Sequence, residues 1–485
     1  MSPQTAILAA LVLPVAGAAG ILLARRRPDL REAVTLSCAA ALFVLVLQLL
    51  PRVLAGERPA VTLFQLLPGI NFAFRVEPLG MLFALVASGL WMVNSLYSIG
   101  YMRANREHAQ TRFYACFALA LACTMGIAFS ANLLTLFLFY EMLTLVTYPL
   151  VTHHQDDEAR RGGRTYMVYL LGSSMALLLV AVISTWLGAG SVEFTPGGLL
   201  GNELSNGEIG LLLALFVFGI GKAAVMPFHR WLPAAMVAPT PVSALLHAVA
   251  VVKAGVFTVV KVIVYVFGVE RIAGLSSVDW LPFIAGFTII AASVVALRSD
   301  NLKRRLAYST ISQLSYVVLA AAILAPLSVI GAALHIAAHA VGKITLFFAA
   351  GAIYTAAHKT QVSELDGIGR RMPLTMTAFA IGAISMIGLP PAAGFISKWY
   401  MLQGAVSGAH WNAVAVIVLS TLLNAAYFLP IVYRAFFAGP AAGEAVHGEA
   451  PPLMVAALCI TAAATVLLFF FPDVPLALAR LMMAD

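Results

Sequence analysis

Charged side chains inside long apolar runs are the residues of this sequence best suited to chemistry. Five lysines and one acid interrupt such runs: Lys222, Lys253, Lys261, Lys343, Lys398 and Glu141. A charged group at bilayer depth costs about 2.5–3.5 kcal/mol on insertion scales, so it usually faces protein or water and serves a function. A low dielectric makes an ammonium release its proton more easily, and a nearby carboxylate opposes that release. The predicted chemistry is therefore the uptake and release of protons near neutral pH.

Glu141 and Lys222 form the pair on which this prediction depends. Each lies near the middle of its apolar run, and Glu141 is the one acid placed well inside such a run. We therefore expect Glu141 to be the charge partner of Lys222. The structural alternatives are a lysine whose ammonium snorkels to the headgroups and a purely structural ion pair. We expect one of these two structural roles for Lys261, with snorkelling foremost, because it lies near the outer end of its run.

Two histidines and a lysine recur at every fourth position in the run LHIAAHAVGKITLFF. His335, His339 and Lys343 therefore share one helix face, and we expect a relay of titratable groups joined by water. The structural alternative is that the histidines make polar contacts between helices. No third ligand lies nearby and the HExxH motif is lacking, so no metal is expected. His247 is a secondary member of the same relay.

Two of the lysines adjoin interrupted helices. Several prolines beginning with Pro227 follow Lys222, and a second set of helix breakers precedes Lys398: Pro390, Pro391 and Gly394. Irregular backbone at membrane depth must line a cavity or be enclosed by protein, and transporters place ion sites beside such breaks. Both breaks are therefore expected to border the proton sites, with His229 in contact with loop backbone at the first.

The composition places these residues in a membrane. Of 485 residues, 61% are hydrophobic and only 10% are charged, which is typical of an all-α polytopic membrane protein and excludes a soluble domain. No soluble segment interrupts the pattern, so residues 1–485 are predicted to form a single membrane domain. The net charge of +8 comes from basic residues in short loops, which indicates membrane topology and not a nucleic-acid surface.

The sequence lacks the motifs of redox and nucleotide cofactors. GIGKAA has neither the third glycine nor the preceding strand of a dinucleotide fold, and no Walker sequence is present. The four cysteines show no spacing for a metal, an iron–sulfur cluster or a disulfide. We therefore expect no cofactor in this chain and no catalytic chemistry of its own.

Apolar runs of about 20 residues, the length of a spanning helix, divide the chain into about fourteen helices. The seventh and the twelfth contain the two breaks. Their offset of five is odd, so equivalent helices cross in opposite senses, which is the pattern of an inverted repeat. Two half-channel repeats are predicted, at residues 112–267 and 278–437. The predicted runs are Thr5–Ala24, Val34–Leu54, Pro78–Tyr97, Phe113–Phe129, Asn132–Val151, Thr165–Leu187, Gly210–Met226, Val242–Phe267, Val278–Leu297, Leu302–Ile323, Leu327–Thr355, Leu374–Gly388, Trp411–Phe437 and Leu453–Phe471.

Basic residues predict the orientation. Nineteen of the 29 Lys and Arg residues fall in alternate loops. The more basic side is cytoplasmic by the positive-inside rule, so both termini are predicted to lie outside, on the periplasmic side of a bacterial cytoplasmic (inner) membrane. The arginines at 25–27 follow the first apolar run and do not precede it, which favours a first spanning helix over a signal peptide.

Four stretches resemble the antiporter-like membrane subunits of respiratory complex I, of Mrp-type cation/proton antiporters and of membrane-bound hydrogenases. They are LTLFLFYEMLTLVTYPLV, GKAAVMPFHRWLPAAMVAPTPVSALLHA, HIAAHAVGK and LPPAAGFISKW, which resemble the family's motifs of helices five, seven, eleven and twelve. The resemblance covers most of the chain and implies fourteen helices with two inverted five-helix bundles. It implies proton-path roles for seven residues: Glu141, Lys222, Lys253, His335, His339, Lys343 and Lys398.

Within this family, length and motifs are most similar to the D-type member of an Mrp-type Na⁺/proton antiporter. Lys398 stands where one complex I type carries glutamate, which disfavours that type. The alternative is a proton-pumping membrane component of a complex I-like NADH–quinone oxidoreductase or of a membrane-bound hydrogenase, and a passive membrane anchor is a third possibility. The resemblance implies other membrane subunits as partners, protons as one ion with Na⁺ as the candidate for a second, and no nucleic acid. It leaves open the parent complex, the second ion and the direction of transport.

Overall fold

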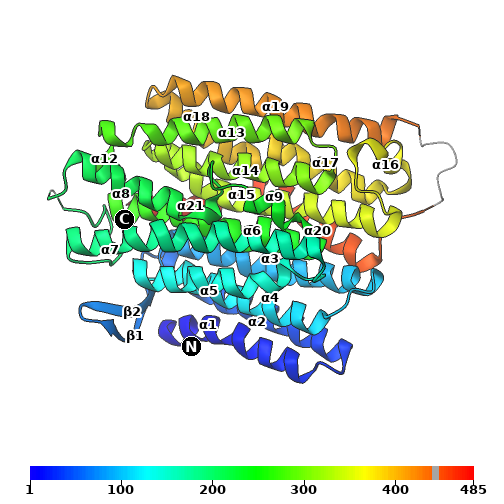
Figure 1. Ribbon diagram of the computed structural model, residues 1–485, viewed down its shortest axis with the longest axis horizontal. Coiled ribbons are helices and arrows are strands. Elements are labelled where there is room, and N and C mark those ends of the chain that lie inside the picture. The colour runs from blue at the N-terminus through cyan, green and yellow to red at the C-terminus, as the bar shows by residue number, and fades with distance from the viewer. Residues whose placement is uncertain (202, 440–446, 485) are drawn as a thin grey trace.

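The computed structural model describes residues 1–201, 203–439 and 447–484 of the chain. Long helices run side by side along one direction, with a short β-hairpin at one end of the bundle (Figure 1). In the described part, eleven helices are long and apolar enough to cross a membrane, and α8 (Asn206–Gly219) and α17 (Pro373–Ile387) are shorter apolar helices. With α14 (Leu302–Ala322) they correspond to the fourteen predicted spans. The chain is therefore a multi-pass helical membrane protein, as predicted.

The first half of the chain contains the hairpin and the first broken span. The helices α6, η1 and α7 form one span, and α10 to η5 form another. The elements are α1 (Pro3–Leu23), α2 (Pro28–Leu54), β1 (Ala60–Leu67), β2 (Ile70–Arg75), α3 (Pro78–Ala104), α4 (Gln110–Phe129), α5 (Leu133–Val151), α6 (Asp157–Ser173), η1 (Ser174–Leu178), α7 (Leu179–Ala189), α8, η2 (Gly221–Ala223), α9 (Trp231–Ala234), η3 (Ala235–Val237), α10 (Thr240–Ala244), η4 (Leu245–Val249), α11 (Val251–Val262) and η5 (Ile263–Phe267).

The second half contains the second broken span, which consists of α17 and α18. Its elements are α12 (Val269–Ile272), η6 (Ser276–Val278), α13 (Trp280–Arg298), α14, α15 (Pro326–Ala357), η7 (Val362–Glu364), α16 (Ile368–Arg371), α17, α18 (Ala393–Ser407), α19 (Trp411–Phe437), α20 (Pro452–Phe470) and α21 (Asp473–Ala484). The predicted run matches α19 and lies within two residues of the ends of α15, whereas α2 begins six residues earlier and α3 ends seven residues later than predicted.

Polar side chains fix where helices begin. Asn132 accepts a hydrogen bond from the N–H of Thr135 (2.8 Å) at the start of α5, and Asp156 accepts one from Ala159 (2.7 Å) at the start of α6. The first N–H groups of a helix have no partner within it, so such a cap stabilises the helix by about 1 kcal/mol. The amide of Asn132 also donates to the carbonyl of Asn71 in β2 (2.7 Å). The start of α5, the helix that carries the predicted acid, is thereby fixed to the hairpin.

The hairpin β1–β2 is not among the predicted elements. Its antiparallel strands are joined at Gly69, whose φ of +80° suits glycine. Phe72 and Phe74 of β2 pack against Phe139 of α5, with ring centroids 5.9 and 5.7 Å away. The prediction rested on apolar runs of about 20 residues, and the two strands and the terminal helix α21 are all shorter than that. Such short elements depend on the surface against which they pack.

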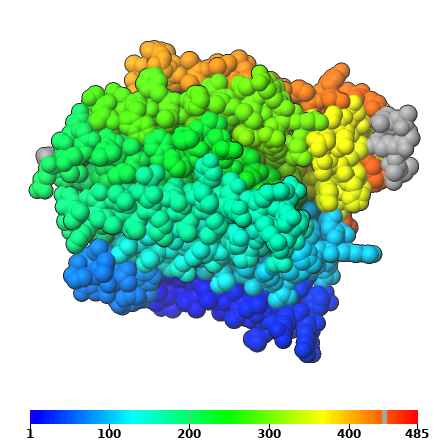
Figure 2. Space-filling view, viewed as in Figure 1, coloured from blue at the N-terminus to red at the C-terminus, as the bar shows by residue number. Residues whose placement is uncertain are grey.

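Two spans lie almost wholly inside the bundle. The span from α10 to η5 is enclosed along its whole apolar length and α15 along nearly all of it, whereas α2 and α19 direct most of their residues outward. Figure 2 shows α1 along one flank of the molecule and α19 along the opposite flank. The enclosed helices carry Lys253 and the face of His335, His339 and Lys343, so these groups lie within protein and not against lipid.

Lys261 corrects one expectation from the sequence. Its side chain is fully buried at the end of α11, and its Nζ lies 3.0 Å from Oε2 of Glu77, just before α3. Nζ also donates to the carbonyl of Ser130 (2.8 Å), and Arg75 donates to the other carboxylate oxygen of Glu77 (2.9 Å). The snorkelling prediction is wrong because these groups surround the ammonium. Lys261 belongs to a buried ion pair between α11 and the start of α3.

Removal of Lys261 should lower stability. In the Lys261→Ala variant Glu77 stays buried with one partner fewer, and breaking a buried ion pair costs about 3–5 kcal/mol. We expect a lower thermal midpoint for the purified chain in detergent, with partial recovery when Glu77→Gln removes the uncompensated charge. Arg480→Ala, at an exposed position of α21, is the control. Equal midpoints for Lys261→Ala and Arg480→Ala would show that the pair contributes nothing to stability.

Candidate functional site

Lys222 lies in the short turn η2, just after α8 ends. Its side chain is fully buried, and its Nζ donates to the carbonyl of Tyr140 (2.7 Å) and to the hydroxyl of Thr144 (2.6 Å) on α5. The ammonium also lies 3.3 Å from the centroid of the Tyr140 ring, in cation–π contact. The main-chain N–H of Lys222 donates to the Tyr140 hydroxyl (3.1 Å). The break in the seventh span is therefore attached to one turn of α5.

Glu141 follows Tyr140 on α5 and is 7% exposed. Within the described residues, no hydrogen bond of ordinary geometry reaches either of its carboxylate oxygens, and the hydroxyl of Ser174 is the polar group nearby. The expected partnership with Lys222 is electrostatic and not a direct ion pair, because Lys222 binds the carbonyl of the preceding residue. A buried carboxylate without a hydrogen bond is costly, and such groups gather at functional sites. Glu141 and Lys222 can each change protonation state without breaking a contact between them.

The backbone around the first break is held by specific contacts. The indole N–H of Trp231 donates to the carbonyl of Gly221 (2.9 Å), which also accepts from the N–H of Ala224 (3.0 Å). The helix α11 crosses the turn at Gly255, where a Cβ would lie 2.6 Å from the carbonyl oxygen of Lys222. Only glycine allows this close approach. Pro227, which follows a cis peptide bond, lies in the irregular segment beyond the turn.

Lys253 on α11 and His339 on α15 are in direct contact. Both side chains are buried, and Nζ of the lysine is hydrogen-bonded to Nδ1 of the imidazole. An imidazole that accepts at one nitrogen carries its proton on the other, so the ring can take a proton on one side and give one from the other. The ring of His335, one turn earlier on the same face, lies 5.9 Å from that of His339. The predicted face therefore meets a lysine from a second enclosed helix.

His247 lies in the π-helical turn η4. In the described part of the chain neither ring nitrogen has a hydrogen-bond partner, and the ring lies 4.6 Å from that of Phe347. It is within electrostatic range of Lys253 and Lys343. Turns of this kind are frequent at functional sites, so His247 stays a secondary candidate.

A chain of hydrogen bonds begins at Lys343 on α15. Its Nζ donates to the hydroxyl of Ser309 on α14 (2.8 Å), which is also hydrogen-bonded to the hydroxyl of Tyr427 on α19 (3.1 Å). The Tyr427 hydroxyl contacts Oδ1 of Asn424, and this oxygen accepts a hydrogen bond from Nε2 of Gln313 (3.2 Å). All five side chains are buried. Three helices therefore supply one continuous polar path through an apolar interior.

Gln313 joins this path to the second break. The amide nitrogen of Gln313 also donates to the carbonyl of Met386 at the end of α17 (3.3 Å). This bond orients the amide so that Oε1 of Gln313 lies 3.0 Å from Nε2 of His335. Nζ of Lys398 donates to the same Met386 carbonyl (2.8 Å). Lys343 and Lys398 are thus connected by hydrogen bonds without interruption.

Lys398 on α18 binds the end of the preceding half-helix. Besides its bond to Met386, it donates to the carbonyl of Ile387 (3.1 Å), the last residue of α17. Such carbonyls have no partner within the helix, and the helix dipole favours a cation there. Pro390 and Pro391, joined by a cis peptide bond, lie between the two half-helices. At Gly394 a Cβ would lie 1.8 Å from a carbonyl oxygen of α17, so the close approach of α18 requires glycine.

Uncharged members of this path are absent from the prediction. Ser309 and Gln313 are four residues apart on α14, and Asn424 and Tyr427 are three apart on α19. Residues at these spacings share a helix face, which is the signal that identified the histidines. The prediction considered only charged and imidazole side chains, so it did not include hydroxyl and amide groups at the same spacings.

The predicted residues form three groups in the structure. They are Glu141 with Lys222, Lys253 with His339, and the path from Lys343 to Lys398 that includes His335. No hydrogen bond between described residues links Lys222 to Lys253. His229 is half-buried and lies apart from the three groups, with its ring 6.4 Å from that of Tyr308.

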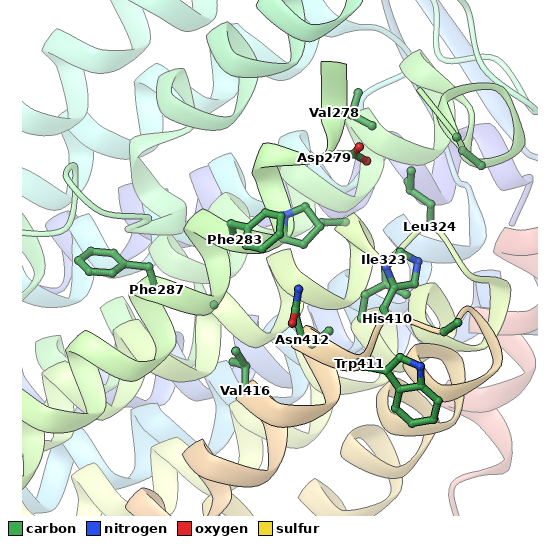
Figure 3. A pocket seen from close by; sticks show the side chains of 17 residues that line it. Val278, Asp279, Phe283, Phe287, Ile323, Leu324, His410, Trp411, Asn412 and Val416 are labelled. Carbon is green, nitrogen blue, oxygen red and sulfur yellow. The ribbon is translucent and has the colours of Figure 1, made fainter. Parts of the chain in front are cut away.

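A hollow of about 600 Å³ lies between α13 and α19, away from the buried lysines. Figure 3 shows Phe283, Phe287 and Trp411 along it, with Asp279 and His410 among its polar groups. The three aromatic side chains are exposed on the outer surface of the bundle. The hollow is therefore a feature of the outward-facing flank and does not contribute to the enclosed polar path.

The sequence matches two described families. Residues 130–424 match the transmembrane family of NADH:quinone oxidoreductase and Mrp antiporters, and residues 68–114 match the N-terminus of chain 5 of NADH-ubiquinone oxidoreductase (complex I). The N subunit of a NADH-quinone oxidoreductase from Desulforudis audaxviator is 34% identical over 389 residues, which cover 78% of this chain and 75% of that protein.

Two antiporter components are also similar. The A/B subunit of a probable K⁺/H⁺ antiporter from Rhizobium meliloti is 31% identical over 79% of this chain, which spans 38% of that protein. The A subunit of a Na⁺/H⁺ antiporter from Alkalihalophilus pseudofirmus is 29% identical over 84% of this chain, which spans 53% of that protein.

Two solved structures share the fold. A chain of the Mrp complex from a Dietzia species has a TM-score of 0.88 at 19% identity, covering 100% of this chain and 97% of that one. A chain of the membrane-bound sulfane sulfur reductase, an archaeal respiratory membrane complex, has a TM-score of 0.88 at 24% identity, with 99% and 97% coverage. Together with the family match over residues 130–424, these findings show that the chain belongs to the family of antiporter-like membrane subunits common to complex I and Mrp antiporters.

Proposed function

We propose that this chain translocates protons within a multisubunit membrane complex, an Mrp-type cation(Na⁺)/proton antiporter of which it is the D-type member. The observation that carries the proposal is the hydrogen-bonded path from Lys343 to Lys398 inside the enclosed helices. Buried ionisable groups are expensive in a membrane, and a passive anchor has no use for a row of them. The distribution of basic loops supports both termini outside a bacterial inner membrane.

A second candidate is the proton-pumping membrane component of a complex I-like oxidoreductase or of a membrane-bound hydrogenase. The 34% identity to an N subunit of NADH-quinone oxidoreductase supports it. Proton flux in vesicles that contain the assembled complex distinguishes the two. Flux driven by a Na⁺ gradient without an electron donor supports the antiporter, and flux that requires NADH or another electron donor supports the oxidoreductase. If the intact complex shows no proton flux under either condition, the result would support a passive membrane anchor.

In the first half of the chain, Lys222 can exist in two protonation states without leaving its site. As an ammonium it donates to the Tyr140 carbonyl and the Thr144 hydroxyl. As a neutral amine it has a lone pair, and the Thr144 hydroxyl can then rotate and donate to it. The charge on Glu141 favours the ammonium. Protonation of Glu141 would therefore promote release of a proton from Lys222.

In the second half, His335 is oriented to accept a proton at Nδ1. The amide oxygen of Gln313 can only accept, so Nε2 of His335 carries the hydrogen and Nδ1 has the lone pair. Nδ1 lies 2.8 Å from the hydroxyl of Ser397, which also lies 3.1 Å from the carbonyl of Gly394. When Nδ1 is protonated, the Ser397 hydroxyl can accept from it and donate to that carbonyl instead. The site therefore accommodates both states of the imidazole.

The amide groups and the hydroxyl groups of the path have different roles. A hydroxyl can accept one proton while it gives up another, as Ser309 and Tyr427 could between Lys343 and the amides. The amide N–H of Gln313 is not acidic, so Gln313 and Asn424 position their neighbours and do not carry the proton. Proton transfer between the three groups of residues requires water. Water is also required for transfer from Tyr427 toward Lys398, because Asn424 and Gln313 do not carry the proton.

Glu141→Gln should remove most proton flux and leave assembly intact. The amide is similar in size and cannot carry the charge that favours protonated Lys222. The measurement is proton flux by the assembled complex in vesicles at matched expression. Glu270→Gln, an exposed acid on α12, is the control for loss of one negative charge. Near-normal flux with Glu141→Ala would contradict the assigned role.

Lys398→Ala and Lys398→Arg should both block proton transfer. The arginine variant keeps a cation for the carbonyls at the end of α17, but a guanidinium does not release its proton in proteins. The measurement is pH-gradient formation in vesicles, with the thermal midpoint as the test of folding. If Lys398 only holds the two half-helices together, Lys398→Arg should transport at the normal rate.

Tyr427→Phe should slow proton transfer because it removes the hydroxyl next to Ser309 and Asn424. We expect a loss of about 100-fold, the lower end of the range for removal of a positioned proton-transfer group. Tyr433→Phe, at an exposed position of the same helix, is the matched control. Flux is measured across a series of pH values for both variants. Equal profiles for Tyr427→Phe, Tyr433→Phe and the unmodified chain would exclude Tyr427 from the path.

A further inference from the structure

Four titratable side chains gather where the α3–α4 turn meets the end of α5. Glu107 and His108 lie in the turn, and His153 and His154 follow α5. One potential ligand atom from each of Glu107, His108 and His154 lies within 4.8 Å of those of the other two. The cluster lies outside the spans and takes no part in the buried path. It brings together residues separated by 45 positions in the sequence.

The contacts of His108 define which of its nitrogens can bind a ligand. Its Nε2 lies 3.0 Å from the main-chain carbonyl of His153, and Arg112 donates to the same carbonyl (2.8 Å). A carbonyl only accepts, so Nε2 carries the hydrogen and Nδ1 keeps its lone pair. Histidines that bind metals usually donate their second N–H to a carbonyl or carboxylate in this way. His108 is therefore already in the tautomer that a metal requires.

Glu107 lies between two imidazoles. Its Oε2 is 3.6 Å from Nε2 of His153 and 3.8 Å from Nδ1 of His154, and its side chain is largely buried. His153 is fully buried, and neither of its ring nitrogens has a hydrogen-bond partner among the described residues. Buried polar groups nearly always have a partner, and each exception needs an explanation. An imidazole that supports the carboxylate of a metal site would explain this one.

We propose that Glu107, His108 and His154 bind a divalent transition-metal ion, with Zn²⁺ as the best fit. Imidazole nitrogens with one carboxylate suit Zn²⁺, whereas Mg²⁺ and Ca²⁺ prefer oxygen ligands alone. Metal–ligand distances of about 2.0–2.2 Å bring ligand atoms to about 3.4 Å from one another. The exposed side chains of His108 and His154 can make that adjustment by rotation. Three protein ligands leave one coordination position open to solvent.

His153 has a supporting role in this site. Its Nε2 faces the Glu107 carboxylate from the protein interior, and its ring lies 4.8 Å from that of His108. Groups that orient metal ligands typically change affinity by about 10–100-fold when they are replaced. The ligands of this site come from two turns, so the spacing of residues along one helix, on which the metal prediction rested, does not reveal it.

Binding of Zn²⁺ alone to the purified full chain tests the proposal. The chain is used without a histidine tag, because a tag would itself bind Zn²⁺. Calorimetry gives the stoichiometry and the affinity of binding. We expect one tight site, weakened at least about tenfold by His108→Ala, by His154→Ala and by Glu107→Gln. His410→Ala, an exposed histidine beside the hollow between α13 and α19, is the matched control and should bind as the unmodified chain does. His153→Gln should weaken binding to a smaller degree than His108→Ala.

Two further measurements separate loss of the site from loss of folding. Without metal, all variants should share the thermal midpoint of the unmodified chain, and Zn²⁺ should raise the midpoint only where the three ligands are present. Co²⁺ in place of Zn²⁺ should give visible absorption bands that the ligand variants lose. Equal Zn²⁺ affinity in the unmodified chain and the three ligand variants would overturn the proposal, as would an equal loss in His410→Ala. The outcome is independent of whether the chain moves protons.

Discussion

The cost of placing a charge in an apolar interior governs this molecule. Every buried ammonium needs acceptors, and a continuous helix offers few because its carbonyls are already bonded within it. The interrupted spans remove this obstacle. Lys398 reaches the carbonyls that the end of α17 leaves free, and Lys222, carried in the turn after α8, reaches a carbonyl and a hydroxyl on α5. The break at the end of α17 therefore supplies the acceptors of Lys398, whereas the turn after α8 places Lys222 against acceptors on the intact helix α5.

The partners of the five buried lysines divide them into two kinds. Lys261 has an acid, Glu77, at 3.0 Å. Among the described residues the other four make hydrogen bonds only to neutral groups: carbonyls, hydroxyls and an imidazole. A carboxylate in contact holds a proton on its lysine, whereas a hydroxyl or an imidazole can serve an amine as well as an ammonium. Under the proposed function, this difference would distinguish Lys261, as a structural lysine, from the four lysines able to exchange protons.

The sequence predicts the helical spans well because each span needs only a long apolar run, and the predicted Trp411–Phe437 coincides with α19. It also predicts the face of His335, His339 and Lys343, since that follows from spacing along one helix. Contacts between helices could not be predicted in this way. The bond from Lys253 to His339 and the environment of Lys261 depend on which faces meet, and one sequence contains no such information. The hairpin was missed for a related reason, since its stability depends on packing against α5.

The two broken spans hold their lysines with acceptors from different places. Those of Lys222 belong to another helix, α5, whereas those of Lys398 belong to the preceding half of its own span. Loss of a proton would therefore have unlike mechanical effects. In the first half it would weaken a contact between two helices, while the Thr144 hydroxyl keeps the amine in place. In the second it would free a joint within a single span and permit bending. The two broken spans would then respond to the same chemical event with different motions.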